Sequence, residues 1–201
     1  MVIIPAQQAG VNMQLLLNSE KAAQAGAFLV RIHGKPLDTI VLIKLLYFAD
    51  RKALIDSGYT ITGDGMVSMP LGPVLTTIYD WIQYGFKDSI PWYKYLSERT
   101  NHLISLVVDN PPVAELSEYE MEVLTGIHAK YGHLGPWEIS DLAHALQEYQ
   151  DPGSSSIPID PNTILRNEGK SDQEIERINR SADEAYQFAS FLRRCENAAR
   201  A

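Results

Sequence analysis

The sequence predicts a mainly α (α+β) fold, with a compact helical domain around one buried central helix, a small antiparallel β element and a long C-terminal helix. Three observations carry this prediction. Residues 38–57 are apolar around almost the whole helical circumference, which is typical of a helix buried at the centre of its domain. Residues 59–71 alternate loosely around a glycine-containing turn, which favours a short strand or a hairpin. Residues 171–192 carry one apolar stripe at helical spacing.

The N-terminal part predicts an arm followed by the first helix of the domain. Residues 1–12 have no periodicity and are expected to form a flexible arm. Asn18 or Ser19 caps a helix that runs to about His33, and Gly34 ends it. We expect one domain over residues 13–150, and a loop with a C-terminal helical extension packing on that domain over residues 151–201.

The central helix is expected to begin after Asp38 as N-cap and to end before Gly58. Lys44, Tyr47 and Arg51 interrupt its apolar pattern on one stripe, so we expect the helix to reach the surface there. Two interpretations stay open. Lys44 extends outward or pairs with a carboxylate, or the stripe borders a binding surface.

A second helix is expected to start at Gly72-Pro73, with proline at its first position, and to end at Gly85. The turn at Gly63-Asp64-Gly65 lacks the longer glycine pattern and lysine of a phosphate loop, so Asp64 is expected to bond to nearby backbone. Residues 90–109 are aromatic and β-branched and predict two short strands around a turn at residues 98–102.

The second half of the chain contains clear helix starts. Capping boxes occur at residues 117–120 and 171–174, where serine is followed by glutamate three residues later. Gly135-Pro136 begins a helix expected to reach about residue 147, and Asp160-Pro161 begins a short one. The end of the terminal helix, from Phe188 to Arg200, combines aromatic and arginine side chains. It either docks on its own domain, or forms a contact in a dimer or with a partner protein.

Composition and charge argue against several classes of function. The chain has 201 residues and a net charge of −8, which opposes general binding to nucleic acid. No apolar run reaches membrane-spanning length, and the N-terminus lacks the basic start of a secretory signal. The single cysteine, Cys195, excludes an internal disulfide. These features together favour a protein of the reducing cytoplasm.

Catalytic and metal chemistry have weak support in the sequence. His128 and His133 are five residues apart, which is not the spacing that brings two imidazoles together on one helix face. Cys195 has no neighbouring base that would make it a nucleophile. We therefore expect no catalytic residues, no metal and no cofactor. A hydrolase using His144 with an acid is kept as a competing hypothesis.

An ordered set of motifs resembles the Panacea domain of SocA-like antitoxins, a family that also includes phage-associated proteins. The resemblance extends over about residues 20–150. The matching residues are Lys44-Leu45-Leu46-Tyr47-Phe48-Ala49-Asp50-Arg51, Gly58, Ile61-Thr62-Gly63-Asp64, Met69, Gly72-Pro73-Val74, Tyr79, Leu116-Ser117, Glu120, Tyr131-Gly132, Leu142 and His144. The sequence lacks the tryptophan expected soon after His144, and Gly-Pro-Trp stands where a hydroxyl cap is expected in the family.

The resemblance implies a non-enzymatic bacterial antitoxin that binds and neutralises a co-encoded toxin protein. One branch resembles adaptors that deliver a cargo to a bacterial protease, so a protease is a second possible partner. No nucleic acid or membrane is expected as a partner, and a homodimer is compatible with the pattern. The candidate partner-binding residues are Lys44, Tyr47, Asp50, Arg51, Asp64, Met69, Gly72, Pro73 and Tyr79.

Overall fold

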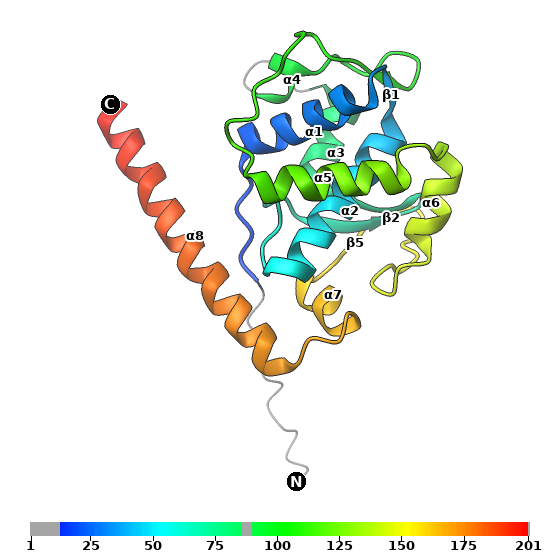
Figure 1. Cartoon of the computed structure of the whole chain (residues 1–201). Helices are drawn as coiled ribbons and strands as arrows, with labels where there is room; N and C mark the ends of the chain where they lie inside the picture. The colour runs from blue at the N-terminus through cyan, green and yellow to red at the C-terminus, as the bar shows by residue number, and fades with distance from the viewer. Residues whose placement is uncertain (1–12, 86–89, 201) are drawn as a thin grey trace.

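The computed structural model describes residues 13–85 and 90–200 and confirms the mainly helical fold with a small β component (Figure 1). The arm expected over residues 1–12 lies outside the described residues. The helices are α1 (Ser19–His33), α2 (Thr39–Ser57), α3 (Thr76–Tyr84), α4 (Trp92–Tyr95), α5 (Glu118–Tyr131), α6 (Pro136–His144), α7 (Pro161–Asn167) and α8 (Asp172–Arg200). The strands are β1 (Leu37–Asp38), β2 (Met66–Met69), β3 (Gly72–Leu75), β4 (Leu103–Ile104) and β5 (Ile157–Pro158).

Helix α2 is the centre of the domain, as predicted. It contacts α1, α3, α5, α6, α7, β1 and β3. The Asp38 carboxylate accepts a hydrogen bond of 2.8 Å from the Ile40 amide and so begins the helix. Gly58 ends it in the left-handed conformation, with φ of +83°. Because neighbours cover most of α2, even its polar residues Lys44 and Asp50 are buried.

The β element consists of two small antiparallel sheets, one with the order β3-β2-β5 and one that pairs β1 with β4. A hairpin is present, but its turn lies at residues 70–71 rather than at the expected residues 63–65. Its second strand includes Gly72 and Pro73, which pair with Met69 and Ser68. The prediction that a helix starts at Gly72-Pro73 is therefore wrong. The helix, α3, begins at Thr76.

The reason for this late start is a cap supplied from earlier in the chain. The Asp64 carboxylate accepts hydrogen bonds from the amides of Thr77 and Ile78, at 3.1 and 2.9 Å. These amides belong to the first turn of α3, which has no other side-chain cap at its N-cap residue, Leu75. Asp64 also accepts from the Gly65 amide, so the expected local turn bond is present as well.

The first of the two strands predicted over residues 90–109 is instead the short helix α4. Trp92 is fully buried, and its ring lies against α1 where Gly26 leaves room. A Cβ atom on Gly26 would be 2.7 Å from the ring, so the close packing of α1 and α4 depends on this glycine. The predicted second strand is reduced to β4, with an isolated bridge between Leu96 and Leu106.

Both predicted capping boxes are confirmed, at the start of α5 and α8. Ser117 and Glu120 exchange hydrogen bonds between side chain and backbone, and Ser171 and Glu174 do the same. Helix α6 begins at Pro136 as predicted, but ends at His144 rather than near residue 147. The chain turns there, and this turn brings Glu148 into the interior of the protein.

Helix α8 is attached to the domain by its N-terminal half. Ile175 and Ala182 are buried, and the Ile178 side chain lies where a Cβ on Gly58 would be only 3.1 Å away. Figure 1 shows the C-terminal half running away from the other helices. Among the residues that the structure describes, no helix has the length and apolar character needed to cross a membrane.

Candidate partner-binding site

The polar stripe of α2 faces inward, which corrects the expectation that α2 reaches the surface on that side. Lys44 is 1% exposed, and its ammonium nitrogen lies 2.8 Å from the carbonyl oxygen of Pro73 in β3. Burial lowers the pKa of Lys44 to about 7. The expectation that this lysine extends outward or pairs with a carboxylate is wrong, because the hairpin covers α2 at this position.

Tyr47 and Arg51 share a carboxylate that the sequence analysis did not identify. The Glu148 carboxylate accepts hydrogen bonds from the Tyr47 hydroxyl at 3.0 Å and from Arg51 Nε at 2.6 Å. Arg51 also forms an ion pair of 2.6 Å with Glu168, just after α7. Burial, together with the nearby Glu148 carboxylate, raises the pKa of Tyr47. This cluster joins α2 to the segments on both sides of β5.

Asp50 holds the loop that follows α2. One of its carboxylate oxygens accepts from the amides of Ile61 and Thr62, each at 3.0 Å, and the other accepts from the Thr62 hydroxyl. Asp50 is fully buried, and burial raises its pKa to about 7 although these hydrogen bonds act in the opposite direction. Asp64, at the end of this loop, is also buried, and burial raises its pKa.

The remaining candidate residues lie on the hairpin and on α3. Gly72 has φ of +89°, and a Cβ there would be 3.0 Å from the Lys44 ammonium, so glycine permits the hairpin to approach α2. Pro73 is buried, whereas Met69 and Tyr79 are half-buried.

Most of the nine candidates thus join α2 to its neighbours. Lys44, Tyr47, Asp50, Asp64, Gly72 and Pro73 are buried, while Arg51, Met69 and Tyr79 keep part of their surface accessible. Their assignment to a partner interface stays a prediction. Sequence reasoning missed Glu148 and Glu168. An arginine on a buried helix requires an acidic partner, and the sequence indicates that much. It does not indicate which of the 25 acidic residues is the partner of Arg51.

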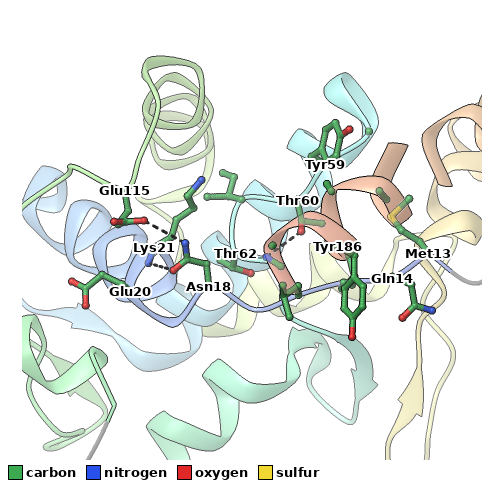
Figure 2. A pocket seen from close by; sticks show the side chains of 18 of the residues that line it. Met13, Gln14, Asn18, Glu20, Lys21, Tyr59, Thr60, Thr62, Glu115 and Tyr186 are labelled. Carbon is green, nitrogen blue, oxygen red and sulfur yellow. Dashed lines mark hydrogen bonds between the residues drawn. The ribbon is translucent and has the colours of Figure 1, made fainter. Parts of the chain in front are cut away.

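A groove lies between α8 and the domain, and we call it the α8 groove. It is more accessible than the candidate residues around α2, most of which are buried. Its volume is about 700 Å³. Four groups of residues line it: the N-terminal residues from Met13 to Leu16, the loop from Gly58 to Gly63, a polar group beside α1 with Asn18, Glu20, Lys21 and Glu115, and the α8 residues Ala182, Ala185, Tyr186, Ala189 and Leu192. Figure 2 shows the labelled side chains of these segments around the groove. The α8 wall is therefore mainly apolar.

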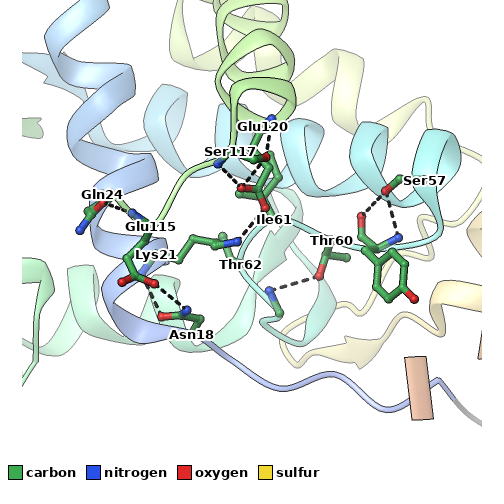
Figure 3. A network of polar contacts seen from close by, with 12 residues as sticks. Asn18, Lys21, Gln24, Ser57, Thr60, Ile61, Thr62, Glu115, Ser117 and Glu120 are labelled. Carbon is green, nitrogen blue, oxygen red and sulfur yellow. Dashed lines mark hydrogen bonds and ion pairs between the residues drawn. The ribbon is translucent and has the colours of Figure 1, made fainter. Parts of the chain in front are cut away.

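The part of the α8 groove beside α1 is polar and well ordered by hydrogen bonds (Figure 3). The side-chain oxygen of Asn18 caps α1 by accepting from the Lys21 backbone N–H at 3.0 Å, and the side-chain nitrogen of Asn18 donates to the Glu115 carboxylate at 3.3 Å. Lys21 forms an ion pair of 2.9 Å with Glu120. The backbone N–H of Asn18 donates to the Thr62 carbonyl, which connects this network to the loop that Asp50 holds.

The arrangement of titratable groups gives no support to a metal or catalytic site. Within residues 13–85 and 90–200, no group of three or more histidine, cysteine or acidic side chains is suitably placed to hold a metal ion. His128 Nε2 lies 3.1 Å from Nδ1 of His33, and burial lowers the pKa of both imidazoles. His144 Nε2 lies 3.1 Å from the Pro70 carbonyl oxygen, so this histidine packs on the hairpin.

Comparison with known proteins supports the resemblance seen in the sequence. The family model described as "Antitoxin SocA-like, Panacea domain" matches residues 42–150, which include most of α2, the hairpin and α3 to α6. No curated protein and no solved structure matches the chain. The matched region is more than half of the chain and contains the framework of buried polar residues around α2. The chain therefore belongs to the family of SocA-like antitoxins with a Panacea domain.

Proposed function

We propose that this protein is an antitoxin that binds and neutralises a co-encoded toxin protein, without catalysis of its own. The family match over residues 42–150 is the observation that carries this proposal. Neutralisation is steric in this proposal: the antitoxin covers or distorts the active site of the toxin. A stable complex of this kind typically buries about 1,600 Å² in total.

The α8 groove is our proposed docking site for a segment of the toxin. Its α8 wall presents Ala185, Tyr186 and Ala189, while the opposite side offers Tyr59, which is 46% exposed. Tyrosine is a favoured anchor at protein interfaces, because it combines a large apolar ring with a hydroxyl group. Arg51, Met69 and Tyr79 are proposed as further contacts, since each keeps accessible surface.

The substitution Ala189→Glu tests this assignment, because it introduces a carboxylate into the apolar wall of the groove. We expect the affinity for the product of the adjacent gene to fall roughly 100-fold, since burying an unpaired polar group costs about 3 kcal/mol. Calorimetric titration of the purified proteins measures the affinity, and growth during co-expression measures neutralisation.

The matched control is Gln187→Glu, which adds a carboxylate two residues away at an exposed position. This control should keep the affinity within about threefold, because its carboxylate stays in water. Equal loss of binding in both variants, with unchanged circular dichroism, would reject the groove as the docking site. Failure of the unmodified protein to bind the toxin or rescue growth would reject the antitoxin function itself.

A protease adaptor is the second candidate function. The specific observation is that Met13, the first described residue, lines the α8 groove, so residues 1–12 connect directly to the proposed cargo site. In this role the arm presents the bound cargo to a bacterial protease. Deletion of residues 1–12 is then expected to lengthen the half-life of the toxin in cells severalfold, while binding is retained. An unchanged toxin half-life would leave steric neutralisation as the mechanism.

A further inference from the structure

Two histidines that are distant in the sequence meet at the ends of α1 and α5. His33 is the last residue of α1, and His128 lies in the last turn of α5. Nδ1 of His33 is 3.1 Å from Nε2 of His128, and the two rings are nearly perpendicular, with an interplanar angle of 78°. One of these nitrogens donates a hydrogen bond to the other. The contact therefore joins the two helix ends.

The position of the His128 ring depends on Gly132, the residue that follows α5. A Cβ atom on Gly132 would lie 2.6 Å from Cδ2 and 2.8 Å from Nε2 of His128. Any larger residue would therefore push the imidazole out of its place beside His33. The Gly132 amide also donates to the His128 carbonyl oxygen at 2.7 Å. The imidazole contact and the backbone at the end of α5 are thus linked.

The hydrogen bond between the rings limits how many protons the pair can bind. In the neutral pair, one ring donates and the other accepts. A first added proton can bind the outer nitrogen of the donor ring, which leaves the hydrogen bond in place. A second must bind the accepting nitrogen, and two N–H groups would then point at each other across 3.1 Å. Two positive charges at this distance repel, so the contact has to open.

The surroundings of the pair are more cationic than anionic. The other charged or titratable side chains around it are Arg31, Lys35, Asp38, Lys130 and His133. Asp38 is the one acid in this set, and its carboxylate accepts from the Ile40 amide at the start of α2. Burial lowers the pKa of both His33 and His128, and the neighbouring His128 ring lowers the pKa of His33 further. These surroundings therefore favour the neutral pair.

We propose that His33 and His128 form an acid-sensitive latch, which holds the end of α1 against the end of α5 at neutral pH and opens when both imidazoles are protonated. Residues 35–36 and 132–135, which follow the two helices, line a cavity of about 630 Å³. Opening of the latch loosens the walls of this cavity. Neither histidine lines the α8 groove, so the latch is independent of the proposed function.

Acid is expected to weaken the folded state at this contact. The pKa of both imidazoles is lower in the folded protein than the ordinary value of 6.5. The unfolded chain therefore binds more protons than the folded protein as the pH falls past 6.5, so the contribution of the pair to stability is present above this pH and is lost below it. The amides of Gly34 and Gly132 report the opening, because they donate to the carbonyl oxygens of Arg31 and His128.

Hydrogen exchange of the unmodified chain at about pH 7.5 and about pH 5.5 tests the latch, with each rate corrected for the intrinsic effect of pH. The protection of the Gly34 and Gly132 amides should fall roughly tenfold at the lower pH, which is the size expected for the loss of one hydrogen bond between side chains. Protection that the unmodified chain keeps at the lower pH overturns the proposal.

The variant His33→Asn removes the acid sensitivity without removing the contact. Its amide nitrogen can donate to neutral His128, and its amide oxygen can accept from protonated His128. Protection of the two amides should therefore be equal at both pH values. The matched control is His133→Asn, at an exposed position, which should keep the acid sensitivity of the unmodified chain. Equal acid-induced losses in His33→Asn and in the unmodified chain overturn the proposal.

Nuclear magnetic resonance of the imidazoles gives a second measurement, which needs no variant. Because the second proton has to break the contact between the rings, His33 and His128 should bind their protons in two clearly separate steps. Two rings that titrate together near the ordinary pKa of 6.5 would overturn the latch, even where a variant fails to fold.

Discussion

Replacing Glu148 with alanine is expected to destabilise the protein by about 3–5 kcal/mol, because it leaves the charge of Arg51 without its buried partner. The Glu148 side chain is fully buried, and that of Arg51 is 14% exposed. The substitution also removes the acceptor of the Tyr47 hydroxyl, which is buried in the same place. A typical domain is stable by about 5–15 kcal/mol, so the loss is a large fraction of the total.

Urea unfolding monitored by circular dichroism measures this loss as a lower midpoint. The matched control is Glu168→Ala, which removes the other carboxylate that pairs with Arg51. The Glu168 side chain is 38% exposed, and an ion pair near the surface contributes only about 0–1 kcal/mol. Glu148→Ala and Glu168→Ala variants of equal stability would contradict the view that the buried cluster holds α2 to the rest of the domain.

Replacing Lys44 with methionine is expected to remove a marked pH dependence of stability. The pKa of Lys44 is about 7 in the folded protein, against an ordinary value of 10.5 in the unfolded chain. Between these values the unfolded chain binds more protons than the folded protein does, so the stability of the unmodified protein rises with pH. One pKa unit corresponds to about 1.4 kcal/mol, so the gain between about pH 7 and pH 9.5 is about 3 kcal/mol.

The difference in the free energy of unfolding between the unmodified protein and the Lys44→Met variant isolates the contribution of Lys44 from that of other titrating groups. The free energies of unfolding of these two proteins, measured at several pH values in that window, should therefore converge at high pH and diverge toward pH 7. The control Lys52→Met removes a lysine that lies on the same helix and whose side chain is 53% exposed. It should leave the slope with pH unchanged. A Lys44→Met variant with the slope of the unmodified protein would mean that Lys44 stays charged in the folded state.

The starts of α2 and α5 were predictable because their causes are local in the sequence. Asp38 lies two residues from the amide that it caps, and Ser117 lies three residues from Glu120, so a short window contains the whole interaction. The position of α2 was predictable for a related reason. A helix that is apolar on every side is stable only when neighbours cover it, and this favours the centre of the domain.

The errors arose where the deciding contact is distant in sequence. The cap of α3 comes from Asp64, so Gly72 and Pro73 were free to join β2 although Gly-Pro is typical of a helix start. Lys44 is buried because the hairpin packs over it, which no local pattern reveals. Glu148 is 97 residues from Arg51, and nothing near either residue indicates that they pair.

The exposed ion pair between Arg51 and Glu168 has a mechanical consequence. Glu168 lies in the short connection between α7 and α8, and the same arginine holds the buried Glu148. The position of this connection therefore depends in part on a contact that dissolved ions screen. Releasing that contact costs little, while the contact to Glu148 keeps the domain intact. Buried Ile175 and Ala182 still hold the N-terminal half of α8 to the domain, so added salt loosens the connection before α8 without detaching the helix itself.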